Sequence, residues 1–356
     1  MSMCTRRERL AAGRAPLYVA TRLYEPSGRY LGARLERGCL QGLRAALAEL
    51  GLEAREPLTF LPFRDSNSAL QDVPPGEFSR AIYDLDRARI EQGYALLAPL
   101  GDLQTDSGVA FEVGYAAGVG TPAVLLWLNF FVLRYDGAEE TLLAPPLLSR
   151  LAVRTENLGA FDLSLRFEDR EDYLRAVAAS LDAAEAQAAE LCRALVAHPP
   201  AARPPNPGPP GRGRVHLEFG GGQFEAQRCW AARLRDELEG AGFAVSISRR
   251  YQESGPLLER AADDLAAAAA SELVVALADG PDVDGETAAL QGYVRGLGRK
   301  VLLYSSGRRR IYTGPEYDHR HNLMLLYSAD RLARSLDGAV EAARALLDQG
   351  SSSTAP

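Results

Sequence analysis

The sequence contains few of the residues that build metal sites and disulfide frameworks. Its 356 residues include four cysteines and four histidines, and the cysteines do not stand at the spacing of metal ligands. Cys39 and Cys229 fall within helical patterns, which indicates buried free thiols. We therefore expect no metal site and a reducing, cytoplasmic location.

The sequence also lacks an excess of positive charge, a long apolar run and a phosphate-binding loop. Its formal net charge is −7, so it offers no basic stripe to a nucleic acid. No apolar run is long enough to span a membrane. Residues 220–222 are glycines without the spacing of a dinucleotide fingerprint, and there is no Walker-type loop. We expect no nucleic-acid partner, no membrane partner and no cofactor.

Apolar residues are abundant, at 47% of the chain, which is enough for a full core. Short apolar runs alternate with helical patterns, and this order predicts a parallel sheet with helices on both faces. A helix over residues 173–195 would close the first domain. The predicted strands are residues 17–20, 58–61, 94–100 and 123–128, followed by 215–217, 273–277 and a last strand at 300–304.

The clearest domain boundary is residues 198–214, which are dense in proline and glycine. Such a segment cannot bury a core and is predicted to be a semi-extended linker. It separates a first domain over residues 16–197 from a second domain over residues 215–349. We expect residues 1–15 to be a disordered leader and residues 350–356 a disordered tail.

The second domain repeats the first. Related residues are separated by one constant interval, with no gap over the whole span. Such a register is hard to obtain by chance, so it predicts an internal duplication. The pairs at this interval are Asp86 and Asp264, Asp106 and Asp284, and Tyr115 and Tyr293.

Residues 106–115 carry the chemistry of the first copy. Asp106 lies in the loop after a predicted strand, and Glu112 lies about one and a half turns into the helix that follows. Ligands bind outside the carboxyl ends of parallel strands, so both carboxylates are placed for acid–base or nucleophilic work. The alternative is that Asp106 caps the helix and Glu112 is solvated.

The two copies differ at their key positions in a complementary way. A leucine cannot act as a nucleophile or a base, so the second copy would have lost any catalytic carboxylate. Each half lacks what the other retains, which predicts one composite site shared between them. The differences are Glu112 against Leu290, Gly108 against Glu286, and the Pro-Leu-Leu of residues 146–148 against the Asn-Leu-Met of residues 322–324.

These features resemble the nucleoside 2-deoxyribosyltransferase family. The resemblance rests on Tyr18, Asp86, residues 106–115, residues 304–309 and residues 322–325. It implies two tandem flavodoxin-like, or Rossmann-like, α/β domains, each with a five-stranded parallel sheet between helices. Family members complete their site with a neighbouring subunit. The resemblance therefore implies an intrachain pseudo-dimer, which could assemble further into a homo-oligomer.

The resemblance also implies a role for each carboxylate. Glu112 matches the nucleophile that attacks C1′ of the deoxyribose, and Tyr18 matches the tyrosine that orients it. Asp86 and Asp106 match aspartates that contact base and sugar and help protonate the leaving base. In the second copy His216 replaces the tyrosine, so that copy is expected to be catalytically degenerate.

The predicted substrate-binding residues come from both halves. Asn322 and Met324 match residues that reach the 5′ side of the sugar across the interface, and Gly108 lies in the catalytic stretch. Arg64 and Asp65 follow the second strand, where contact with the base and structuring of the loop are equally good readings.

The expected reaction is exchange of the base of a 2′-deoxyribonucleoside with a free nucleobase by retaining double displacement through a deoxyribosyl–Glu112 intermediate. Crowded carboxylates should raise at least one pKa by repulsion. Two alternatives stay open, namely an N-glycosidase that uses water as acceptor and a non-catalytic nucleotide-binding protein.

Overall fold

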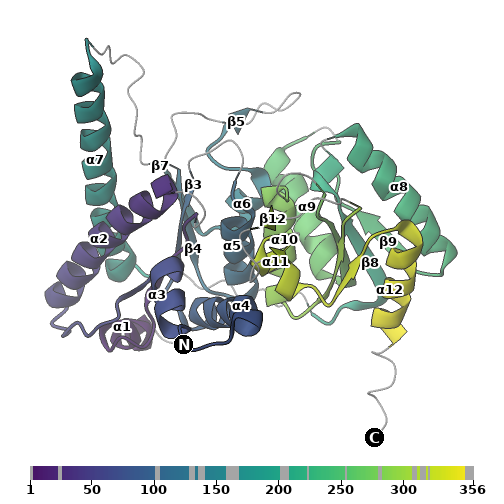
Figure 1. Cartoon of the computed structure of the whole chain (residues 1–356), viewed down its shortest axis with the longest axis horizontal. Helices are drawn as coiled ribbons and strands as arrows, with labels where there is room; N and C mark the ends of the chain where they lie inside the picture. The colour runs from purple at the N-terminus through teal and green to yellow at the C-terminus, as the bar shows by residue number, and fades with distance from the viewer. Residues whose placement is uncertain are drawn as a thin grey trace, which may run out of the picture.

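The structure, a computed structural model, describes residues 3–22, 26–100, 105–127, 133–134, 141–157, 168–200, 208–222, 224–252, 255–279, 283–306, 311–312, 318–319 and 321–348. Two five-stranded parallel sheets stand side by side with helices around them (Figure 1). This α/β architecture confirms the fold class expected from the alternation of apolar runs and helical patterns.

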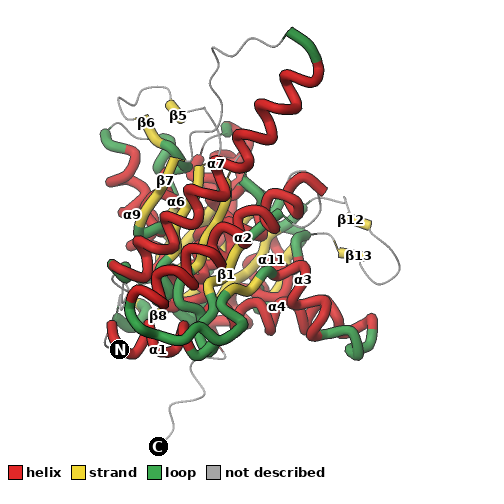
Figure 2. Tube along the Cα trace, turned by 90° about the vertical axis from the view of Figure 1, so that its left-hand side faces the viewer, coloured by secondary structure: helices red, strands yellow, loops and turns green. Residues whose placement is uncertain are grey.

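The first sheet has the strand order β2-β1-β3-β4-β7. Helices α2 and α7 cross its outer face (Figure 2), and α4 and α5 cover the face turned to the second half. The strands are β1 (Leu17–Val19), β2 (Thr59–Phe60), β3 (Leu96–Leu100), β4 (Ala123–Trp127) and β7 (Arg154–Asn157). The helices are α1 (Met3–Ala11), α2 (Pro26–Glu49), α3 (Pro62–Ala69), α4 (Pro75–Gln92), α5 (Ser107–Val119), α6 (Pro146–Leu151) and α7 (Arg170–Ala197).

The second sheet has the equivalent order, β14-β11-β10-β8-β9. Helices α8 and α12 cover its outer face, and α9 and α10 face the first half. The strands are β8 (Gly211–Glu218), β9 (Ala244–Ile247), β10 (Ser271–Leu277), β11 (Lys300–Tyr304) and β14 (Arg331–Ala333). The helices are α8 (Glu225–Gly240), α9 (Leu257–Ala269), α10 (Gly285–Gly296), α11 (Leu323–Ser328) and α12 (Leu336–Asp348), with a 3₁₀ turn η1 (Gly220–Gly222). Short pairs β5–β6 (Leu133–Arg134, Thr141–Leu142) and β12–β13 (Ile311–Tyr312, Asp318–His319) complete the strands.

One apolar core joins the two halves, with α5 packed against α10. Their backbones meet at glycines, since a Cβ on Gly114 would lie 1.8 Å from the carbonyl oxygen of Ala289, and one on Gly292 would lie 2.1 Å from that of Phe111. The two contacts exchange residues at equivalent positions of the two halves, which is the signature of an isologous interface. The halves therefore pack as an intrachain pseudo-dimer.

Strand register supports the equivalence of the copies. Tyr18 on β1 pairs with Leu96 on β3, and His216 on β8 pairs with Val274 on β10. Leu96 and Val274 are related by the interval found in the sequence. His216 therefore stands at the position of Tyr18 in its own sheet.

Several expectations at the ends of the chain and the strands were wrong. Residues 3–11 are not a disordered leader but form helix α1, because Leu10 is fully buried in the outer core of the first domain. Residues 211–214, assigned to the linker, belong to β8, where Arg214 pairs with Ala244. The tail over 350–356 and the linker residues 201–207 lie outside the described residues.

Short or polar segments also escaped the sequence analysis. The strand at residues 300–304 is not the last, because β14 pairs with it. Strands β7 and β14 are short and partly polar, so they carry no apolar run. The segment after β2, read as a polar loop, is helix α3 with Pro62 in its first turn. Of the two cysteines predicted to be buried, Cys39 is buried and Cys229 is exposed.

Among the described residues, no helix is both long and apolar enough to cross a membrane.

Candidate active site

A cleft at the carboxyl edge of the first sheet brings together residues of both halves. Its cavity volume is about 30 Å³, which is room for about one water molecule. Three carboxyl groups of the first half line it opposite the start of α11 from the second half. The lining consists of Thr21, Ile82, Asp86, Asp106, Gly108, Val109, Glu112, Asn322, Leu323 and Met324.

Glu112 is the buried centre of this cleft. Its Oε1 accepts a hydrogen bond of 2.7 Å from the hydroxyl of Tyr18, and the side chain is 6% exposed. Burial raises the pKa of Glu112 well above its usual range, the charge of Asp86 raises it further, and the Tyr18 bond acts in the opposite direction. The sequence reading of Glu112 as a solvated helix residue is therefore wrong.

Asp86 lies on α4 beside Glu112, with 2% of its surface exposed. Its Oδ1 accepts a hydrogen bond of 2.5 Å from the hydroxyl of Ser66 on α3. Burial raises the pKa of Asp86 to about 7, while the Ser66 bond lowers it. The expectation of a raised pKa is confirmed, but burial is the main cause for both carboxyl groups.

Asp106 serves two purposes at once. Its side chain caps α5 by accepting a bond of 3.0 Å from the backbone N–H of Val109, as the alternative reading proposed. It also lines the cleft, so the cap holds a carboxylate at the site.

Asn322 reaches the first half from the start of α11. Its Oδ1 caps that helix by accepting from the backbone N–H of Met324 at 2.9 Å. A Cβ on Gly108 would lie 2.7 Å from Nδ2 of Asn322, so a larger residue at position 108 would have to displace the Asn322 amide. The structure thus brings Asn322, Met324 and Gly108 together as the sequence predicted.

Arg64 and Asp65 are not among the described residues that line the cleft. Arg64 pairs with Glu36 at 2.8 Å and with Asp65 at 2.6 Å, and Asp65 accepts from the backbone N–H of Leu61 at 2.8 Å. Of the two readings of this pair, the structure shows the one in which it structures the start of α3.

The sequence analysis missed Ser66 and Thr21. Ser66 follows the predicted second strand by a few residues, and its spacing to Asp86 follows no motif. Thr21 lies just beyond the end of β1, so its place after a parallel strand was the one available signal.

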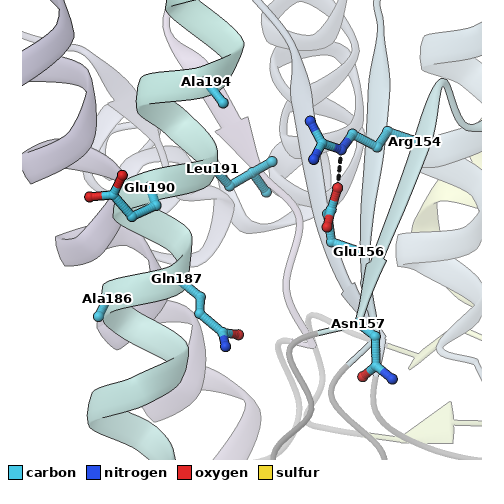
Figure 3. Close-up of a pocket in the computed structure, with 8 residues that line it drawn as sticks. All are labelled: Arg154, Glu156, Asn157, Ala186, Gln187, Glu190, Leu191 and Ala194. Carbon is cyan, nitrogen blue, oxygen red and sulfur yellow. Dashed lines mark hydrogen bonds and ion pairs between the residues drawn. The ribbon is translucent and has the colours of Figure 1, made fainter.

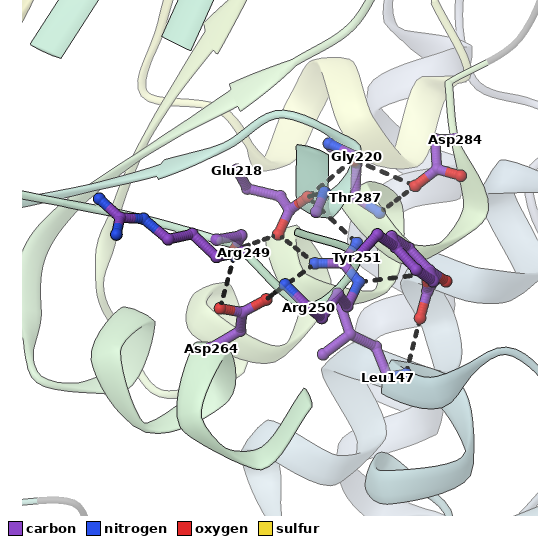
Figure 4. A network of polar contacts seen from close by, with 12 residues as sticks. Leu147, Glu218, Gly220, Arg249, Arg250, Tyr251, Asp264, Asp284 and Thr287 are labelled. Atoms are coloured by element: carbon purple, nitrogen blue, oxygen red, sulfur yellow. Dashed lines mark hydrogen bonds and ion pairs between the residues drawn. The ribbon is translucent and has the colours of Figure 1, made fainter. Parts of the chain in front are cut away.

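The equivalent place in the second half is filled by Arg250 (Figure 4). Its guanidinium is fully buried and pairs with Glu218 at 2.9 Å, Asp264 at 3.3 Å and Glu286 at 3.1 Å. Asp264 and Glu286 are the counterparts of Asp86 and Gly108. Arg250 therefore lies between the counterparts of two residues that line the cleft in the first half.

This network crosses the domain interface. Glu286 also accepts from the backbone N–H of Leu147 at the start of α6, at 2.7 Å. Asp284 caps α10 through the backbone N–H of Thr287, and Leu290 is fully buried. The aspartate retained at position 284 thus serves as a helix cap here.

His216 forms hydrogen bonds of 2.9 Å from its two ring nitrogens to Ser246 and Ser248. Burial lowers the pKa of His216 to about 4, so the ring is neutral at physiological pH. Its counterpart Tyr18 is hydrogen-bonded to the carboxylate of Glu112, whereas His216 is hydrogen-bonded to two serine hydroxyls.

A larger hollow of about 600 Å³ lies between the edge strand β7 and helix α7 (Figure 3). It is wide and its charged residues Arg154 and Glu156 pair with each other. None of the predicted site residues lines it. Within the described residues, no group of histidine, cysteine and carboxylate side chains is arranged to hold a metal ion.

Clustered carboxylates at the strand ends of a parallel α/β fold are typical of an enzyme active site. Comparison with known proteins indicates which family the site resembles. Residues 27–143 match the family model described as nucleoside 2-deoxyribosyltransferase. The family consists of glycosyl-transferring enzymes that act on small nucleoside substrates. The matched part contains Asp86, Asp106 and Glu112, whereas Tyr18 and Asn322 lie outside it.

No curated protein matches the chain. Among solved structures, it is similar to a "putative phosphosugar isomerase" from Silicibacter pomeroyi DSS-3, at 15% identity over 98% of this chain and 92% of that chain. The TM-score is 0.22, and so low a value supports no conclusion about fold or function.

Proposed function

We propose that this protein is a nucleoside 2-deoxyribosyltransferase that exchanges the base of a 2′-deoxyribonucleoside. The observation that carries the proposal is the buried Glu112, held by the Tyr18 hydroxyl beside Asp86 in a cleft lined by both halves. It lies in the part of the chain that matches the family.

In the proposed reaction Glu112 attacks C1′ and displaces the base. The bond from C1′ to the base nitrogen breaks and a bond to the carboxylate oxygen forms, through an oxocarbenium-like transition state. An acceptor base then attacks C1′ from the face that the first base left. Two inversions at one carbon give retention of configuration.

The carboxyl cluster supplies the proton that the leaving base needs. Burial and mutual repulsion raise the pKa of Glu112, and burial raises the pKa of Asp86. At neutral pH the two groups together therefore carry less negative charge than two exposed carboxyl groups would. The reaction needs the charge on Glu112 and the proton on Asp86. The Tyr18 hydroxyl favours this distribution because it stabilises the carboxylate form of Glu112.

The second half contributes Asn322, Leu323 and Met324 to the lining of the cleft. The Oδ1 of Asn322 is used by its helix cap, which turns Nδ2 toward position 108 and leaves a hydrogen-bond donor for a sugar hydroxyl. The cavity is smaller than a nucleoside, so binding requires lining side chains such as Met324 to change rotamer, which its unbranched chain permits.

We further propose that the second half is a degenerate copy of the first, so that each chain has one active site. The equivalent strand orders, the matching registers of Tyr18 and His216 and the constant sequence interval support this origin.

The proposal is tested by incubating the protein with mixed purine and pyrimidine deoxynucleosides, with and without free bases, and separating the products. Base exchange supports the proposal, with loss in Glu112→Gln as the control. Free base and free sugar without exchange would instead identify a hydrolase. No turnover of any nucleoside, with binding retained, would identify a nucleotide-binding protein.

A further inference from the structure

The buried hydroxyl of Ser66 lies directly behind Asp86. Ser66 is 1% exposed on α3, and its Oγ donates to Oδ1 of Asp86 at 2.5 Å. We infer that Ser66 is a positioning residue that occupies one oxygen of Asp86 and so directs the transferable proton to the other oxygen, at the cleft. This inference rests on the proposed function.

The argument follows from the two oxygens of a carboxyl group. A hydroxyl that donates to Oδ1 leaves Oδ2 as the oxygen that carries the acidic proton. Among the described residues, Ser66 is the one side chain hydrogen-bonded to Asp86, and Asp86 lines the cleft. A proton held on Oδ2 is therefore the one available to a leaving base.

The charged groups around Asp86 make its protonation sensitive to this bond. Glu112 on α5, Asp106 before α5 and Tyr18 on β1 face the same space. From α11, the lining side chains Asn322, Leu323 and Met324 carry no charge.

On the side of α3, Arg64 and Asp65 pair with each other and with Glu36. On α4 itself, Arg87 and Arg89 lie over the rings of Tyr83 and Phe60. Ser66 is thus the contact that favours the charged form of Asp86, against the burial that raises the pKa of Asp86.

The test compares Ser66→Ala with Ser66→Cys, Ser66→Thr and the matched control Ser68→Ala, which lies on the same helix and bonds the carbonyl of Arg64. The pH profile of kcat for base exchange is measured for each. In parallel, the carboxyl carbon of Asp86 is titrated by NMR without substrate, with its signal assigned through Asp86→Asn.

Loss of the donor should move the alkaline limb of kcat and the Asp86 titration together to higher pH, by about one unit or more in Ser66→Ala. Ser66→Cys, whose thiol is a weak donor of similar size, should shift in the same direction. Ser66→Thr should restore the wild-type limb, and Ser68→Ala should not move it.

The outcomes separate this inference from the proposed function. If the wild type exchanges bases but neither Ser66→Ala nor Ser66→Cys shifts the limb or the titration, the role of Ser66 is refuted and the proposed function stands. If the wild type turns over no nucleoside, the proposed function fails, and the NMR titration still decides whether Ser66 controls the Asp86 proton. Should Ser66→Ala fail to fold, the near-isosteric cysteine variant decides.

Discussion

The two halves place carboxylates at the same edge of the same fold but neutralise them differently. In the first half Asp86 and Glu112 face a cleft, and burial raises the pKa of both. In the second half Glu218 faces Arg250, whose charge overcomes the effect of burial and lowers the pKa of Glu218. Buried carboxylates require either a proton or a cation. The first half therefore has carboxyl groups with raised pKa values at a cleft, whereas the second half has a buried ion cluster.

The start of the interface helix is satisfied differently as well. In α11 the backbone N–H of Met324 is capped by Asn322 of its own half. In α6 the N-cap is Pro145, which provides no side-chain cap, and the N–H of Leu147 is satisfied by Glu286 from the other half. Where the first half has a glycine to admit Asn322, the second has a carboxylate that fills the gap.

The largest contrast between the halves is expected from their equivalent residues on α5 and α10. Glu112→Ala should abolish base exchange, with a loss of several orders of magnitude in kcat, on the order seen when other nucleophiles are removed. Its matched variant Leu290→Ala should keep the chemistry and only loosen packing. Near-normal turnover by Glu112→Ala on every nucleoside would show that the site is assigned wrongly.

The next largest effect is expected from the two arginines that follow the second strand of each half. Arg250→Ala leaves three buried carboxylates without their cation and should cost about 3–5 kcal/mol of unfolding free energy. The equivalent Arg64 is half-exposed and its removal leaves one buried carboxylate, Glu36, without its cation, so Arg64→Ala should cost less than Arg250→Ala. Denaturant unfolding of both variants measures the difference, and equal losses would contradict the structural role of the Arg250 cluster.

The interface glycines should give an intermediate effect. Gly292→Ala puts a methyl group 2.1 Å from the carbonyl oxygen of Phe111, and overpacking of this kind costs about 1–3 kcal/mol. It should also lower activity, because the α5–α10 contact holds the halves that share the cleft. Gly76→Ala on α4, where a Cβ would meet no atom within 4 Å, serves as the control and should leave turnover unchanged without lowering the unfolding midpoint.

The smallest effect is expected in the pH dependence of stability. The pKa of Asp86 is about 7 in the folded protein, whereas an aspartate in the unfolded chain has a pKa of 3.8. The folded state therefore binds this proton more tightly, and stability falls as pH rises from about 4 through 7. Asp86→Asn should remove this loss, a gain of about 1–2 kcal/mol at pH 8.

Denaturant midpoints between pH 4 and 8 check this prediction. The surface variant Asp84→Asn on the same helix is the control, since Asp84 is exposed and paired with Arg80. A midpoint of Asp86→Asn that follows the wild-type curve at every pH would contradict the raised pKa of Asp86.

Much of the site could be read from the sequence because its residues occupy positions that secondary structure defines. The alternation of apolar runs predicted the parallel sheets, and the rule that ligands bind at their carboxyl edges directed attention to Asp106 and Glu112. The complementary differences between the two halves predicted that residues 322–324 would complete the site, and the structure places Asn322 next to Gly108. Strands without apolar runs, such as β7 and β14, carried no signal of this kind.

The sequence by itself determined the parallel α/β fold and the carboxylates at the sheet edge, since these depend on local periodicity and fixed spacing. Only the tertiary structure decided the rest. Ser66 donates to Asp86 across two helices, Arg250 is drawn from a loop into a buried ion cluster, and α1 docks through Leu10. Each is a contact between segments brought together by folding, where burial converts ordinary serine, arginine and leucine residues into parts of a site or a core. The spacing of residues along the chain does not predict which partner a buried polar group will contact.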